Sequence, residues 1–115
     1  MTCVLFAHRD VDYFAPKLRA EFPTLKVLTA MDLPEADEHL AAAEVIFANG
    51  HTFNDARLGK AGKLKWIQAM TTGTDAITGS RALRPEVIVT TTRGIHGPQM
   101  SEMAFMYVLN LARNF

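Results

Sequence analysis

The sequence predicts a flavodoxin-like α/β fold: an open parallel sheet of five strands with helices on both faces, followed by a long apolar C-terminal helix. Two observations predict this class. Short apolar runs alternate with helical patterns, and several runs are continuously apolar, as in strands buried on both faces of a parallel sheet. The connections are short, which favours right-handed βαβ units. The order of the strands is not predicted.

The predicted strands are the five apolar runs at residues 3–7, 25–28, 45–48, 64–68 and 87–90. The first helix is predicted from apolar residues at three- and four-residue spacing, namely Val11, Phe14, Leu18 and Phe22. Pro34 suits the first position of a second helix, which would run through Leu40 to about residue 43. Asn54 or Asp55 would cap a third helix that stops at Gly62.

Length, charge and cysteine content limit the function classes. A chain of 115 residues corresponds to one domain, and its 12 basic residues balance its 12 acidic ones. Zero net charge argues against nucleic acid and anionic membranes as partners. The single cysteine, Cys3, cannot form an internal disulfide, which favours a buried thiol in a reducing compartment. Apolar stretches are shorter than the roughly 18 residues of a membrane span, and signal-peptide features are absent, so we expect a cytoplasmic protein.

The loop after the fourth predicted strand is the strongest candidate for a binding site. Ligands of open α/β sheets bind beyond the carboxyl ends of the strands. In Thr72-Gly73-Thr74, glycine permits close approach of the backbone to a ligand, consecutive N–H groups can bind an anion, and the threonine hydroxyls add donors. A small carboxylate is a suitable ligand. The alternative is an ordinary turn in which Asp75 caps a short helix through Ile77.

A second loop, Asn49-Gly50-His51, follows the third predicted strand. Asn-Gly is a strong turn signal, which by itself can explain the loop. His51 would face the same crevice and could donate to a substrate oxygen. A lone loop histidine is nevertheless more often a solvated surface residue, so both interpretations stay open.

The last segment, residues 98–115, is predicted to be a helix with almost no polar face before Arg113. Pro98 fits the first turn, where free N–H groups favour an anion or a polar ligand. A helix that is apolar all round requires cover all round, and a five-stranded sheet can cover only one side of it. The other side needs something outside this chain or a second copy. Gly94 and Gly97 do not match the dinucleotide-binding fingerprint, which has a third glycine and a downstream acid.

Several of these segments together resemble a known family. The sequence at 64–68, Thr72 to Asp75, Val89-Thr90, 93–97 and Ser101-Glu102 is similar to the N-terminal region of D-isomer-specific 2-hydroxyacid dehydrogenases. The resemblance implies a flavodoxin-like substrate-side domain that is interrupted by a Rossmann domain binding NAD(H) or NADP(H). It also implies a reversible reduction of a 2-oxo acid to a D-2-hydroxy acid.

The same resemblance implies roles for particular residues. The backbone of Thr72, Gly73 and Thr74 would bind the 2-oxo acid carboxylate. The loop of Asn49, Gly50 and His51 would line the opposite wall, and Met100 would lie near the nicotinamide. On this basis residues 1–97 form an incomplete substrate-side domain, and residues 98–115 form a helix that bridges to the cofactor domain.

The chain departs from the family pattern by stopping before the glycine fingerprint, the ribose-binding acid, and the catalytic arginine, glutamate and histidine. We therefore expect an inactive fragment with no catalytic residue of its own, no metal site and no bound cofactor. NAD or NADP would act in the full-length parent. The expected partners are the missing NAD-binding domain, a small 2-oxo or 2-hydroxy acid, and a second copy packed through residues 98–115.

Two other α/β classes share the five-strand pattern. A receiver domain would use acids such as Asp10 and Asp12 after the first strand, but its phosphoacceptor aspartate is absent after residue 48, as is a lysine after the fifth strand. An FMN-binding flavodoxin would have a hydroxyl- and glycine-rich first loop, where this chain has His8 and Arg9. Both classes remain as alternatives.

Overall fold

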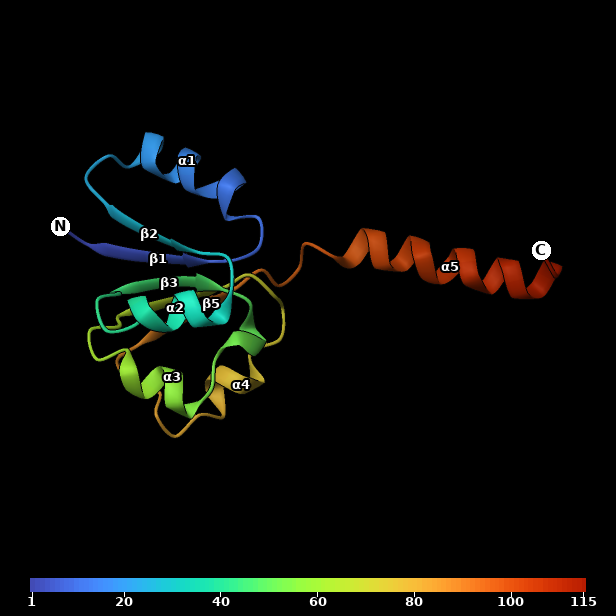
Figure 1. The fold of residues 1–115 in the computed structure, drawn as a ribbon. Helices are drawn as coiled ribbons and strands as arrows, with labels where there is room; N and C mark the ends of the chain where they lie inside the picture. Colours follow the sequence, from blue (N-terminus) through green and yellow to red (C-terminus); the bar gives the residue numbers. More distant parts are fainter.

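A computed structural model describes all residues, 1–115, and contains one five-stranded parallel sheet with the order β2-β1-β3-β4-β5 (Figure 1). The strands are β1 Cys3–Ala7, β2 Lys26–Ala30, β3 Val45–Ala48, β4 Trp66–Ala69 and β5 Ile88–Thr91. This arrangement confirms the predicted fold class. It also supplies the strand order, which reverses direction between β1 and β3 because β2 lies on one side of β1 and all later strands lie on the other.

The helices follow the predicted alternation with strands. They are α1 Val11–Glu21, α2 Leu33–His39, the 3₁₀ turn η1 Gly50–Thr52, α3 Asp55–Lys60, α4 Asp75–Thr78 and α5 Gly97–Arg113. The Asn54 side chain accepts a hydrogen bond from the N–H of Arg57 at 2.8 Å, as predicted for a cap. The short helix of the alternative interpretation is present as α4, but its cap is Thr74, and Asp75 is its first residue.

Two helices end earlier than predicted, because their last turns tighten. After α2, the N–H of Ala42 donates to the carbonyl of His39 at 3.1 Å, three residues back, so the helix does not reach residue 43. After α3, the N–H of Ala61 bonds the Leu58 carbonyl in the same way at 3.2 Å. Such bonds satisfy terminal carbonyls and stop the α-helical pattern.

The sheet has a closed face and a partly open face. Helices α2, α3 and α4 lie on one face, over a core whose largest fully buried side chains are Leu5, Ile46, Ile67 and Ile77. Helix α1 lies on the other face, where Phe6, Val11 and Ala15 are buried together and the Phe6 ring stacks on Phe14 and Phe47.

On the α1 side, the part of the sheet formed by β4 and β5 has no helix above it (Figure 1). Trp66 is half-buried there and donates from Nε1 to the Thr90 hydroxyl at 2.7 Å, while Ile88 is 62% exposed. The Thr90 hydroxyl in turn donates to Oε1 of Gln68 at 2.6 Å. An apolar cavity of about 330 Å³ opens beside the end of α1, against Phe22, Trp66 and neighbouring side chains.

Helix α5 extends away from the sheet, and none of its residues is buried (Figure 1). The radius of gyration is 17.3 Å, against about 13 Å for a compact chain of this length. The expectation that the sheet covers one side of this helix was therefore wrong. The chain turns away after β5 through a segment that includes Gly94, whose φ of 95° is accessible mainly to glycine. No helix combines the length and hydropathy needed to cross a bilayer.

Candidate functional site

The carboxyl ends of the parallel strands form one edge of the sheet, and two predicted loops meet at this edge. The loop from β3 enters η1, and the loop from β4 enters α4. Their contact is formed by Gly50, whose N–H donates to the Thr71 hydroxyl at 2.8 Å. The same hydroxyl donates to the Gly73 carbonyl at 3.2 Å. Thr71 therefore links the two loops.

Gly50 is needed for this contact. A Cβ atom at position 50 would lie 2.1 Å from the Gly73 carbonyl oxygen and 2.8 Å from the Thr71 hydroxyl, so no other residue fits without movement of backbone. The Asn49-Gly50 pair does not form a turn with positive φ, because Gly94 and Asn114 are the residues with that conformation. The predicted turn is present, because the Thr52 N–H donates to the Asn49 carbonyl at 3.0 Å, but the close approach of the two loops is what requires glycine at position 50.

The loop after β4 presents free backbone donors. The N–H groups of Thr72, Gly73 and Thr74 donate to no atom of the protein. A Cβ atom added at Gly73 would meet nothing within 4 Å, so space is open in front of this backbone. The Thr72 and Thr74 hydroxyls also make no hydrogen bond within the protein. The loop therefore has the donors that an anion requires.

A cavity of about 360 Å³ lies between the two loops and is lined by Gly50, His51, Thr71, Gly73, Asp75 and Ala76. Thr72 and Thr74 are not among its lining residues, so Gly73 is the one of these three residues that borders the cavity. The Asp75 carboxylate borders the cavity and repels an anion on that side. An anionic group would accordingly lie toward Gly73 and His51.

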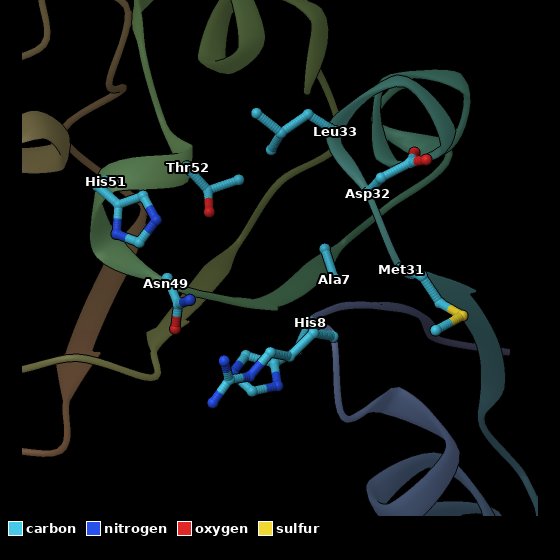
Figure 2. Close-up of a pocket in the computed structure, with 9 residues that line it drawn as sticks. Ala7, His8, Met31, Asp32, Leu33, Asn49, His51 and Thr52 are labelled. Carbon is cyan, nitrogen blue, oxygen red and sulfur yellow. The ribbon is translucent and has the colours of Figure 1, made fainter.

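A second cavity, of about 220 Å³, lies at the ends of β1, β2 and β3 (Figure 2). This is the point at which the strand order reverses, where ligands of open α/β sheets bind. Its lining is Ala7, His8, Arg9, Met31, Asp32, Leu33, Asn49, His51 and Thr52. His51 lines both cavities, so they adjoin at this residue.

His8, Arg9 and Asp32 were not predicted as site residues, although His8 and Arg9 were considered in the flavodoxin alternative. The strand order brings them to one cavity, because it places the ends of β1 and β3 side by side. The His8 ring is held in place, because its Nδ1 accepts the N–H of Asp10 at 3.1 Å and its edge meets the Phe14 ring at 6.2 Å. With Nδ1 as an acceptor, the ring proton is on Nε2.

An arginine behind the cavities fixes the loop that carries Asn49 and His51. Nε of Arg57 donates to Asp37 at 2.7 Å, and its Nη1 donates to the Thr52 carbonyl at 3.1 Å. The hydrogen bond from Arg57 holds the pKa of the Asp37 carboxyl below its ordinary value. This pairing joins α2, η1 and α3 and leaves the Asn49 and His51 side chains without protein partners.

Met100, the seventh predicted site residue, is not brought to this edge. It lies in the first turns of α5, is 65% exposed, and lines neither cavity. The other six predicted residues gather at the carboxyl edge, where Asn49 and His51 line the strand-reversal cavity and Gly50, His51 and Gly73 line the other.

Comparison with known proteins identifies the family. A model described as "D-isomer specific 2-hydroxyacid dehydrogenase, catalytic domain" matches residues 4–108. The chain belongs to this family. A crystal structure of a D-isomer specific 2-hydroxyacid dehydrogenase family protein from Aeromonas salmonicida subsp. salmonicida A449 is similar, with a TM-score of 0.85 and 30% identity over 99% of this chain. Among curated proteins, no significant match is found.

This family member covers only part of its structural relative. The chain spans 36% of the length of the Aeromonas protein. The match excludes the receiver and flavodoxin alternatives as the class of this chain, and it confirms the resemblance seen in the sequence.

Proposed function

We propose that this chain forms the substrate side of an oxidoreductase that reversibly reduces a 2-oxo acid to a D-2-hydroxy acid with NADH or NADPH. The observation that carries the proposal is that three consecutive N–H groups, of Thr72, Gly73 and Thr74, donate to no protein atom at the carboxyl edge of the sheet, where the space beside Gly73 is open. Family membership supplies the reaction class.

The proposed binding mode uses the two linked loops. The substrate carboxylate accepts from the free N–H groups around Gly73, which are charge-assisted bonds worth about 1.5–3 kcal/mol each. His51 lies on the other side of the same cavity and has no protein partner, so its ring is free to donate to a substrate oxygen. Thr71 holds the two loops at a fixed separation through its bonds to Gly50 and Gly73.

These 115 residues do not fit a nicotinamide cofactor by themselves. Gly94 and Gly97 lack the fingerprint spacing, and Met100 is an exposed helix residue bordering neither edge cavity. A bound nicotinamide would supply the hydride, and we place its domain and the acid/base groups outside these residues. A contact between Met100 and the nicotinamide remains part of the proposal, as does the choice between NAD and NADP.

The exposed helix α5 is the proposed contact with that cofactor domain and with a second copy of the chain. Its apolar residues are 47–84% exposed at positions such as Met103 and Leu111, so they lack the cover that apolar helices require.

A reducing, cytoplasmic location also belongs to the proposal, because Cys3 is the single cysteine and is buried as a free thiol.

Titration of the isotope-labelled chain with pyruvate tests the carboxylate site. We expect amide shifts at Thr72, Gly73 and Thr74, and their loss in Gly73→Val, which fills the open space with a branched side chain. Gly62→Val is the matched control, since a Cβ atom at Gly62 also meets nothing within 4 Å but lies away from this edge. Shifts that survive Gly73→Val, or none with the unchanged chain, would contradict the site.

The reaction itself is tested with and without the cofactor domain. The chain alone should oxidise no NADH or NADPH with glyoxylate, pyruvate or hydroxypyruvate, because hydride transfer needs a positioned cofactor and an acid/base group. In a full-length parent, Gly73→Val should lower kcat/KM at least tenfold while the fold survives, as the loss of one charge-assisted bond implies. An unchanged kcat/KM would contradict the binding of the substrate carboxylate at Gly73.

A further inference from the structure

The cavity at the strand-reversal point carries more hydrogen-bond donors than the proposed reaction uses. His8 presents a protonated Nε2, Asn49 has a free side-chain amide, and His51 has no protein partner. The Arg9 guanidinium is 87% exposed and pairs only with Asp10, at 3.5 Å. Four residues with donor groups, from the ends of β1 and β3, therefore line one small cavity.

The formal charges that line this cavity balance, with Arg9 positive and Asp32 negative, so its hydrogen-bond donors and not its net charge would attract an anion. Its one acid, Asp32, accepts the N–H of Glu35 at 2.9 Å as the cap of α2, so part of its charge is engaged by the helix. Figure 2 shows the Asp32 carboxylate turned toward the α2 side, away from Asn49 and His51. The guanidinium of Arg9 is a planar fork that matches a carboxylate.

The two cavities are neighbours on the carboxyl edge of the sheet. His51 lines both, with the free N–H groups of Gly73 and its neighbours on one side and the His8 loop on the other. Ala7, Met31 and Leu33 add apolar lining to the strand-reversal cavity.

We propose, as an extension of the proposed function, that the strand-reversal cavity is a subsite for a second carboxylate, so that the preferred substrate is a 2-oxo dicarboxylic acid. The first carboxylate binds at Gly73, the methylene groups pass His51, and the distal carboxylate accepts from Arg9, Asn49 and His8. Arg9 is thus a specificity-determining residue, which acts on the distal end of the substrate and not on the reacting carbon.

The test compares two acids that share a five-carbon chain, 2-oxoglutarate and 2-oxopentanoate, by titration of the isotope-labelled chain. Both should shift the amides of Thr72, Gly73 and Thr74. The diacid should bind at least tenfold more tightly, and it alone should shift the ring signals of His8.

Arg9→Met should abolish the preference for the diacid and leave the affinity for 2-oxopentanoate unchanged. Arg81→Met is the control, because Arg81 is also an exposed arginine and lies outside both cavities. The Arg9 side chain is exposed, so its replacement should leave the fold intact. Asn49→Ala should also reduce the preference for the diacid, and it is judged by the ratio of the two affinities because Asn49 lies in the proposed substrate loop.

Each outcome separates this inference from the function on which it rests. Equal affinity for the two acids, or a diacid preference that survives both Arg9→Met and Asn49→Ala, would overturn the second subsite and leave the carboxylate site at Gly73 in place. Failure of both acids to shift the amides around Gly73 would overturn the proposed function and this inference together.

Discussion

The sheet with its surrounding helices and the C-terminal helix α5 are both rich in apolar residues but have opposite burial. The sheet region buries 20 apolar residues, including Leu5, Ile46 and Ile67 at no more than 1% exposure. In α5, side chains of the same kinds, such as Met106 and Leu109, are more than half exposed. Apolar composition therefore does not decide burial. A second surface has to lie against the apolar one.

The sheet region and α5 are also stabilised in different ways. Helices α2, α3 and α4 complete the core on their face of the sheet, so this region has what an independent fold requires. Helix α5 keeps its shape through its own backbone and gains nothing from packing. Isolated helices of this length are marginal in water, so α5 depends on a partner for its persistence.

The largest expected effect is self-association through α5. About five large apolar side chains in water cost roughly 1.5–3 kcal/mol apiece relative to burial, which rivals the stability of a small domain. We expect a dimer or larger species at micromolar concentration by sedimentation velocity. Polar replacement of Met103, Met106 and Leu109 together should shift it toward monomer. A compact, folded monomer of the unmodified chain at high concentration would contradict the proposed self-association through α5.

The next largest effect is on the free energy of unfolding, when leucine is replaced by alanine in each of the two regions. Leu5→Ala should cost about 2–5 kcal/mol of unfolding free energy, because it leaves a cavity in a closed core. Leu111→Ala, at a side chain 84% exposed, should change it by no more than about 0.5 kcal/mol. Both values come from urea unfolding at a concentration where the chain is monomeric. A comparable cost at Leu111 would show that α5 is buried in solution.

Within the sheet region, two glycines of the candidate site should differ. Gly50→Ala should destabilise by about 1–3 kcal/mol, since its Cβ would overlap the Gly73 carbonyl. Gly73→Ala faces open space and should leave thermal unfolding nearly unchanged, while weakening binding of a 2-oxo acid. Equal loss of stability in both variants would contradict the close approach of the two loops.

The smallest effect is on how the stability of the fold depends on pH, through Glu44 at the base of the sheet. Hydrogen bonds from Lys65, at 2.6 Å, and from the N–H of Cys3, at 3.0 Å, hold the pKa of Glu44 below its ordinary value. A lowered folded-state pKa stabilises the fold above the ordinary value of 4.5 and loses that contribution as the pH falls below it. Glu44→Gln should therefore flatten the fall in Tm between about pH 5 and pH 3. An unchanged acid profile would contradict the assignment.

Local sequence determined most of the secondary structure. The apolar runs became the five strands within about two residues, and the Asn54 cap and the Pro98 start of α5 are where the sequence indicated them. These features depend on the pattern of a few neighbouring residues, so the sequence alone specifies them. The family resemblance was readable for the same reason, because its most specific segments are short and continuous.

The tertiary structure alone decided the strand order, the link between Gly50 and Gly73, and the path of α5. The first brings His8 and Arg9 beside Asn49, residues about 40 positions apart in sequence, and so creates a cavity that no single loop indicated. The second depends on a contact between two loops from neighbouring strands. The third depends on which surface the chain meets after β5. Each is a contact across space, and a local sequence pattern does not state which distant surface will lie against it.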